Sequence, residues 1–285
     1  MLSIVDLPLA LLSLALVLHV IGERRAAIKT GRPRSATDRR RALLFYAGLL
    51  TIGIALIGPI DDLAPKLFWV HMLQHVLLLT VGAPLIVLGA PWLAIWRPLP
   101  LGFRRAVAKT VARSPALWPL RALARLFGQP GPAWIAFSTN LVFWHLPFAY
   151  DLTLRSAGVH VLEHVTFMLS GVLLWAQVLD SPPLRLRLAA IHRVYFIVGA
   201  TVVGWLISLV LAFASHPLYD VYAQLAHRPG GISALADQQL ASGIMLGPGS
   251  LAATLYVFIG LYRWLGRSEP DGLVEPEQGS GRQYA

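Results

Sequence analysis

The sequence has 285 residues, of which 56% are hydrophobic and only 13% are charged. Soluble domains carry about 25% charged residues, so this composition excludes an ordinary soluble protein and indicates a membrane protein. Cysteine is absent, which excludes disulfides, iron–sulfur clusters and thiolate metal sites. The net charge of +10 does not indicate a nucleic-acid partner, because the distribution of basic residues follows the predicted membrane topology.

Apolar segments recur along the chain, and most reach the roughly 20 residues that a membrane-spanning helix needs. They lie at about residues 7–21, 42–60, 67–89, 132–148, 159–179, 191–214 and 240–265. The first is the weakest, but it lacks the basic start and the cleavage site of a signal peptide, so we expect it to remain as a span. The predicted fold class is therefore all-α: a polytopic membrane protein whose domain, residues 1–265, is a seven-transmembrane-helix bundle.

The basic residues give this bundle an orientation. All of them except Lys66, Arg155 and Arg228 fall in segments that alternating spans place on one side of the membrane. The positive-inside rule makes that side cytoplasmic, so the N-terminus is predicted outside and the C-terminus inside. Anionic lipid of the bilayer is the expected partner of these charges.

Several segments depart from straight spans. Residues 103–127 mix arginines with aliphatics at helical spacing, which predicts an amphipathic helix on the cytoplasmic surface, broken near Pro115 and Pro119. Pro84 predicts a kink inside the third span, and residues 247–249 (Gly-Pro-Gly) predict a break in the last. Residues 266–285 are polar and are predicted to form a disordered cytoplasmic tail.

Two histidine pairs open two of the spans. His71 and His75 are four residues apart, and so are His160 and His164. On a helix, this spacing places both side chains of a pair on one face. Superimposing the two pairs gives a modest indication of internal duplication. The aligned residues are Asp62 with Asp151, His71 with His160, His75 with His164 and Gly82 with Gly171.

The predicted topology places every histidine except His19 and His192 at or near the outer side. Ionisable residues at membrane depth are costly and therefore point to function. Imidazole binds copper, zinc, iron and nickel, and the absence of thiolates favours copper over structural zinc. The predicted metal ligands are His71, His75, His160 and His164. Candidates for further ligands, or for residues that hydrogen-bond the ligands, are His145, Asp151, Asp237, Asp62, Glu163, Met72, Met245 and His216.

Other interpretations of the same residues stay open. Histidines at a membrane interface often only pack or anchor a helix, and methionines in apolar spans usually fill the core. Paired histidines on neighbouring helices can also ligate haem, which would make the protein an electron carrier. A metal-free scaffold is the third alternative. A zinc hydrolase is weaker, because Glu163 directly precedes His164 and the His-Glu-x-x-His pattern is absent.

A set of motifs carries a resemblance to a known family. They are His71-Met72-Leu73-Gln74-His75 with Ala83-Pro84-Leu85 and Leu88-Gly89-Ala90-Pro91, then Trp144-His145-Leu146-Pro147 with Tyr150-Asp151, then His160 with Glu163-His164, and Asp237-Gln238-Gln239 with Gly243-Ile244-Met245 and Gly247-Pro248-Gly249. Over about residues 40–265 the chain resembles the CtaG family of multi-spanning cytochrome c oxidase assembly factors. The absence of cysteine separates it from the single-span, cysteine-bearing copper chaperone of the same name. Leu246 stands where the family often has tryptophan, so no role is carried over for that position.

The resemblance implies a multi-pass protein of the bacterial inner membrane that is not an enzyme. It implies a role in building an active haem–copper oxidase, by helping copper reach an oxidase subunit. Zinc and haem are less favoured cargoes, and the identities of the copper donor and the client subunit stay open.

Overall fold

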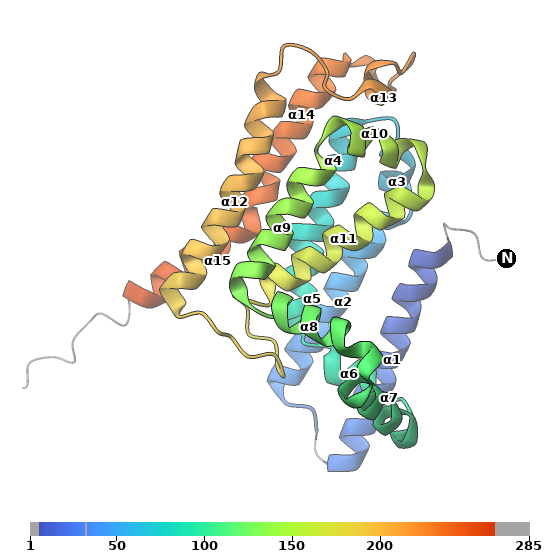
Figure 1. Cartoon of the computed structure of the whole chain (residues 1–285), viewed down its shortest axis with the longest axis vertical. Helices are drawn as coiled ribbons and strands as arrows, with labels where there is room; N and C mark the ends of the chain where they lie inside the picture. Colours follow the sequence, from blue (N-terminus) through green and yellow to red (C-terminus); the bar gives the residue numbers. More distant parts are fainter. Residues whose placement is uncertain (1–5, 32, 266–285) are drawn as a thin grey trace, which may run out of the picture.

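The computed structural model describes residues 6–31 and 33–265, and every regular element in these residues is helical (Figure 1). Within this part of the chain, six helical segments are long and apolar enough to cross a membrane. They are Leu7–Thr30, Ala36–Leu63, Phe68–Gly89, Ala157–Trp175, Ala190–Phe213 and Ala234–Leu265. The prediction of an all-helical, polytopic membrane protein is confirmed. The predicted tail at 266–285 lies outside the described residues.

The elements follow one another with short connections. In the first half they are α1 (Asp6–Thr30), α2 (Ala36–Leu56), α3 (Pro59–Leu63), α4 (Phe68–Val76), η1 (Leu77–Gly82), α5 (Ala83–Gly89), α6 (Trp92–Trp96), α7 (Leu101–Arg113), η2 (Pro115–Leu117) and α8 (Trp118–Phe127). In the second half they are α9 (Pro130–Trp144), α10 (Pro147–Arg155), α11 (Ala157–Trp175), α12 (Ala190–Phe213), α13 (Asp220–Ala223), η3 (Pro229–Gly231), α14 (Ala234–Leu246), η4 (Pro248–Ser250) and α15 (Leu251–Leu265).

The predicted span at residues 132–148 corresponds to α9, which has only 15 residues. A helix of this length rises by about 22 Å, less than the roughly 30 Å hydrocarbon core of a bilayer. α9 nevertheless packs between α11 and α12, in line with the long helices (Figure 1). The seventh crossing, and with it the orientation in the membrane, therefore stays a prediction.

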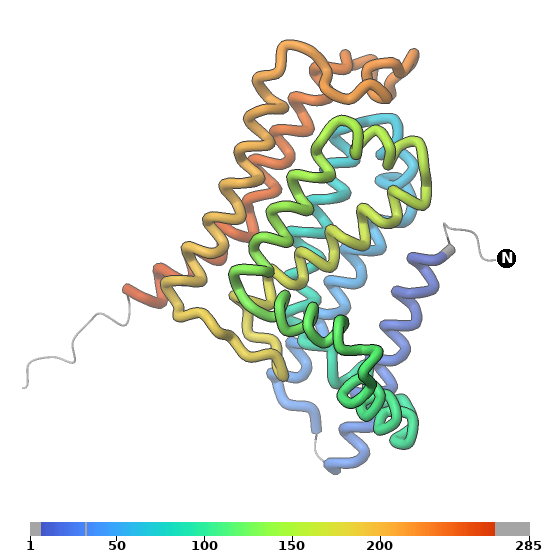
Figure 2. Tube along the Cα trace, in the orientation of Figure 1, coloured from blue at the N-terminus to red at the C-terminus, as the bar shows by residue number. Residues whose placement is uncertain are grey.

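One span lies at the centre of the bundle (Figure 2). It consists of α4, η1 and α5, and it is the most buried of the six candidate spans. Its neighbours are α2 on one side, α11 on another and α14 on a third. α4 and α11 both begin at the end of the bundle that carries α10 and α13 (Figure 1). The two histidine pairs thus enter the bundle from the same end.

Pro84 gives the central span an irregular turn. η1 is a π-helical turn, in which the N–H of Ala83 donates to the carbonyl of Leu78, five residues back. The same pattern would require an N–H at Pro84 to serve the carbonyl of Leu79, and proline has none. Trp175 of α11 supplies the missing donor, with Nε1 2.9 Å from the Leu79 oxygen. The predicted kink is thus a π turn that is tied to α11.

Two glycines let helices approach this turn closely. A Cβ at Gly171 of α11 would lie 3.0 Å from Cδ2 of Leu79 and 3.1 Å from Cβ of Ala83. A Cβ at Gly82 would lie 3.0 Å from a side-chain carbon of Ile52 on α2. Small residues permit such close packing of membrane helices. The short distance between η1 and α11 brings the faces that carry the histidines together.

The two predicted breaks are confirmed. The segment around Pro115 separates α7 from α8, and no residue of either helix is buried, as expected for helices on the surface. The last span breaks at Gly247, where φ is −80° and ψ is −82°, so α14 and α15 are joined by the short turn η4. This break lies beside the central span, because Cγ2 of Val76 would be 3.4 Å from a Cβ at Gly249.

Candidate metal centre

The two histidine pairs meet in the interior of the bundle. The ring centroid of His71 is 5.0 Å from that of His160, and the centroid of His75 is 5.5 Å from that of His164. Within each pair the centroids are 4.5 Å and 4.2 Å apart, as four-residue spacing on a helix predicts. α4 and α11 therefore present their histidines to each other in the register that the sequence alignment indicated.

Glu163 lies among these rings. It is three residues after His160 and therefore on the same face of α11. Its Oε2 is 3.5 Å from Nε2 of His71, and its Oε1 is 3.6 Å from Nε2 of His75. The side chain is fully buried, and neither carboxylate oxygen has a hydrogen-bond partner in the described structure. A buried carboxylate without partners is costly, so this position calls for a cation.

Four side chains form a compact group of possible ligands, which we call the histidine–glutamate cluster: His71, His75, Glu163 and His164. One ligand atom from each lies within 4.8 Å of all the others, and all four residues are buried. Metal–ligand bonds of about 2.0–2.2 Å place tetrahedral ligand atoms about 3.4 Å apart, so small side-chain movements would close the group around an ion. His160, half-buried, adjoins the cluster at the end where α11 begins.

The nitrogens of the cluster are free to bind. Nε2 of His71, Nε2 of His164 and both ring nitrogens of His75 are buried without a hydrogen-bond partner in the described structure. Nε2 of His160 is in the same state. Because buried polar atoms are nearly always paired, several unpaired nitrogens in one place make this cluster a candidate binding site.

Tyr222 determines which nitrogen of His71 is available. Burial raises the pKa of Tyr222 well above its ordinary value, so the hydroxyl keeps its proton. That proton is donated to the carbonyl of Ala64, which can only accept. The hydroxyl oxygen, 3.2 Å from Nδ1 of His71, must then accept the Nδ1–H. A neutral His71 consequently carries its lone pair on Nε2, which faces the cluster. Such a partner on the other nitrogen is typical of histidines that bind metals.

A hydrogen bond also fixes the tautomer of His145, which lies beside the cluster. Its Nδ1 donates to the carbonyl of Leu141 at 2.7 Å, so Nε2 carries the lone pair. That Nε2 is buried and has no partner in the described structure. Its ring centroid is 6.5 Å from that of Phe167, which in turn packs against His75 at 4.5 Å. His145 thus stays a candidate for a further ligand, outside the four-residue group.

Asp237 positions α4 and does not face the cluster. Its two carboxylate oxygens accept from the backbone N–H groups of Phe68 and Trp69, at 2.9 Å and 3.0 Å. Arg228 lies 4.0 Å away as a counter-charge. These N–H groups are the first two of α4 and have no partner within the helix. The carboxylate, contributed by α14, therefore fixes the helix start just before His71.

The other predicted residues lie elsewhere. Asp151 accepts from the N–H of Val221 at 3.4 Å and so ties α10 to α13. Asp62 and His216 are exposed, and neither belongs to the group of possible ligands. Met72 and Met245 line a cavity next to the cluster.

Two residues that contact the first histidine motif were not among the candidates named from the sequence. Tyr222 lies in α13, a short helix in the connection between the last two long spans, and no helical periodicity relates it to the histidines. Asp61, rather than Asp62, approaches the central span, where it accepts from Nε2 of Gln74 at 2.9 Å. Gln74, inside the first histidine motif, is fully buried and was the signal that a polar partner was needed there.

The family model of the cytochrome c oxidase caa3 assembly factor (Caa3_CtaG) matches residues 17–267. Searches of the curated proteins and of the solved structures gave no match. The matched range contains the whole histidine–glutamate cluster and nearly all of the described helices. It also agrees with the resemblance that the motifs indicated. This chain therefore belongs to the cytochrome c oxidase caa3 assembly factor family.

Proposed function

We propose that this protein binds copper at the histidine–glutamate cluster and assists its delivery to cytochrome c oxidase during assembly. Membership of the assembly-factor family supports a role with the oxidase, and it suggests a role other than catalysis. The observation that carries the copper proposal is the buried Glu163. Among the described residues its two oxygens have no hydrogen-bond partner, and they face the unpaired Nε2 atoms of His71 and His75.

A bound cation would compensate the buried negative charge of Glu163. One carboxylate and three neutral imidazoles would surround an ion with one negative charge and three strong donors. In the described structure, the ion-pair contacts of Glu163 are with histidines alone, so no lysine or arginine competes for the carboxylate. The donor set suits copper or zinc. We favour copper because the haem–copper oxidase that the family assembles requires it.

A cargo site must release its ion, and His160 offers a way to do so. It is half-buried, its Nε2 has no partner in the described structure, and its ring is 4.2 Å from His164 and 5.0 Å from His71. Replacing one cluster ligand by His160 would move the ion toward the end of the bundle. We therefore assign His160 to the exchange of copper with a partner protein.

The geometry argues for an ion rather than haem. Two axial histidines must lie on opposite faces of a macrocycle. Here the ring centroids of the paired residues are 4.2–6.3 Å apart and the side chains are in mutual contact. A macrocycle between them would have to separate α4 from α11, which Gly171 and Trp175 hold together.

Metal analysis of the purified protein tests the proposal. We expect the wild type to bind copper when it is supplied under reducing conditions, and we expect Glu163→Gln and His75→Gln to lower the affinity by at least about tenfold. His19→Gln is the matched control, because His19 is buried against Phe45 and Tyr46, far from the cluster in the chain. Unchanged copper binding in both cluster variants would exclude this site. A Soret band in the purified protein would favour haem instead.

The same variants should be tested in cells. Deletion of the gene should lower the copper content of the oxidase, and the wild type and His19→Gln should restore it. Glu163→Gln should not restore it although the protein reaches the membrane in normal amounts. Normal oxidase copper in the deletion strain would favour a metal-free scaffold.

A further inference from the structure

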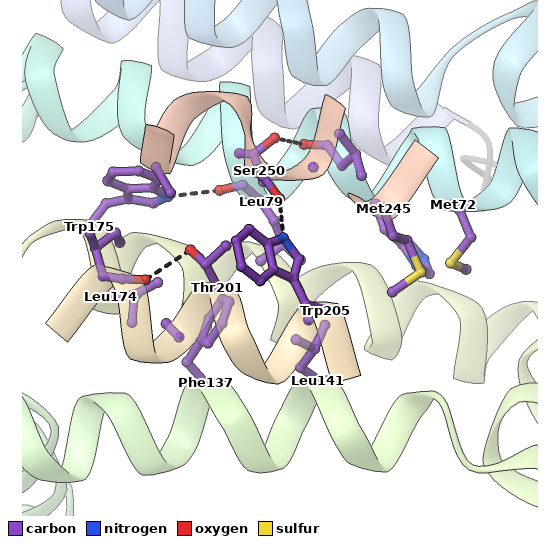
Figure 3. A pocket seen from close by; sticks show the side chains of 18 of the residues that line it. Met72, Leu79, Phe137, Leu141, Leu174, Trp175, Thr201, Trp205, Met245 and Ser250 are labelled. Atoms are coloured by element: carbon purple, nitrogen blue, oxygen red, sulfur yellow. Dashed lines mark hydrogen bonds between the residues drawn. The ribbon is translucent and has the colours of Figure 1, made fainter. Parts of the chain in front are cut away.

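A cavity of about 90 Å³ lies beside the histidine–glutamate cluster, among α4, η1, α9, α11, α12 and the broken last span (Figure 3). His75 lines it and also belongs to the cluster, so the two sites share a wall. Since one buried water needs about 10–15 Å³, the cavity has room for an ion and several waters. Its walls belong mainly to candidate membrane spans, so a ligand there must be held by protein groups alone.

Most polar groups in this cavity are already used. Nε1 of Trp175 donates to the carbonyl of Leu79, and Nε1 of Trp205 donates to Oγ of Ser250 at 2.6 Å (Figure 3). The hydroxyls of Thr80 and Thr201 donate to backbone carbonyls one turn earlier. These four donors are therefore occupied and are not available to a polar organic ligand.

The groups that remain are donors of electron pairs to a soft metal. Nε2 of His145 carries a lone pair and has no partner in the described structure. Met72 and Met245 contribute thioethers from α4 and α14. Figure 3 shows these two methionines next to each other, at the end of the cavity away from Trp175. Met72 is fully buried, and Met245 packs against the same group of buried residues.

We propose that the cavity contains a second metal site, in which Met72, Met245 and His145 bind Cu(I). Thioethers select Cu(I) over harder ions, whereas the imidazoles and the carboxylate of the cluster also accept Cu(II) and zinc. The chain would therefore hold two coppers in adjoining sites of different softness, with His75 between them. This inference rests on the proposed function insofar as copper is the cargo.

X-ray absorption at the copper edge tests the second site. The protein is loaded with Cu(I) under anaerobic, reducing conditions, and the neighbours of copper are identified as sulfur or as nitrogen and oxygen. We expect two coppers per chain and clear copper–sulfur scattering in the wild type. Met72→Leu and Met245→Leu, which keep the volume of the side chain, should each lose the sulfur signal and one of the two coppers. Met168→Leu is the control, because Met168 packs in the core but is not among the residues that line this cavity.

The outcomes separate the two proposals. Copper bound with only nitrogen and oxygen neighbours, or unchanged sulfur scattering in both methionine variants, would overturn the second site and leave the proposed function intact. Absence of bound copper would overturn both. Glu163→Gln should keep the sulfur-containing site while weakening the cluster, and loss of the sulfur signal in that variant would contradict two separate sites. The wild-type measurement decides whether sulfur binds even where a variant fails to fold.

Discussion

A histidine binds a metal through a nitrogen with a free lone pair, so the hydrogen bond at its other nitrogen decides whether it is ready to bind. In this protein His71 donates Nδ1–H to Tyr222, and His145 donates Nδ1–H to a backbone carbonyl. Both residues are thereby fixed in the tautomer that aims Nε2 at a site. The energetic cost of orienting these rings is met in folding and would not have to be met again if a metal bound at Nε2.

Replacing Tyr222 by phenylalanine should weaken metal binding without removing a ligand. The variant loses the hydroxyl that accepts from Nδ1 of His71, so either nitrogen of the ring can carry the proton. Loss of such a partner typically lowers metal affinity by about 10–100-fold. Competition titration with a copper chelator measures the effect.

The matched control is Tyr46→Phe. Tyr46 contacts Nδ1 of His19 at 3.2 Å, so this variant breaks a second histidine–tyrosine pair that is not part of the cluster. Copper affinity equal to that of the wild type is expected. A similar loss in both variants would mean that the effect of Tyr222 comes from general destabilisation.

The sequence predicted the histidines of the cluster better than their partners. Four-residue spacing and the alignment of the two pairs were enough to expect His71 and His75 opposite His160 and His164, and the structure brings them together. Glu163 was expected only as one of several candidates for a further ligand or a partner of a ligand, although its position three residues after His160 puts it on the same helix face. Tyr222 lies in the short helix α13, whose position follows from tertiary packing and cannot be read from any sequence period.

At the scale of elements, the site depends on how closely α11 approaches the central span. Gly171 leaves room for Leu79 and Ala83. Trp175, four residues after Gly171 in α11, donates a hydrogen bond to the Leu79 carbonyl. The carbonyl needs this bond because Pro84 cannot donate to it. The π turn η1 and its contact with α11 therefore depend on the same hydrogen bond.

A double-mutant cycle can test this coupling. Trp175→Phe should destabilise the protein by about 1–3 kcal/mol through the unpaired Leu79 carbonyl, with a further loss from the smaller ring. Pro84→Ala restores a backbone N–H five residues after Leu79. In the Pro84→Ala background, Trp175→Phe should therefore cost about 1 kcal/mol less than in the wild type. Unfolding in detergent measures each free energy.

The control cycle combines Pro84→Ala with the replacement of a surface tryptophan instead of Trp175. Trp118 of α8 is 64% exposed, so Trp118→Phe and Pro84→Ala should be additive. Additivity of Trp175→Phe with Pro84→Ala as well would show that the π turn does not depend on the tryptophan. The sequence predicted a kink at Pro84, but not its π form, because that form depends on a donor from a helix about ninety residues away.

At the scale of the molecule, the cluster lies toward the end of the bundle where α4 and α11 begin, and α6, α7 and α8 lie toward the opposite end (Figure 1). The positive-inside rule predicts that the end with α7 and α8 is cytoplasmic. The cluster would then open toward the outer face, where copper would be exchanged. Hydropathy and charge were sufficient to predict the helical fold, but the predicted span at residues 132–148 stays untested because α9 has only 15 residues.

Because the natural chain has no cysteine, single-cysteine variants can determine the topology without background labelling. Lys109, Gln129, Arg155 and His227 are exposed in the structure, and Gln129 and Arg155 lie on either side of α9 with α10. In intact cells, a membrane-impermeant thiol reagent should label Arg155→Cys and His227→Cys but not Lys109→Cys or Gln129→Cys. A permeant reagent should label all four and so control for accessibility.

Labelling of Gln129→Cys together with Arg155→Cys would mean that α9 does not cross the membrane. Labelling of Lys109→Cys and Gln129→Cys alone would invert the orientation and place the cluster toward the cytoplasm, where copper would have to be delivered from inside the cell.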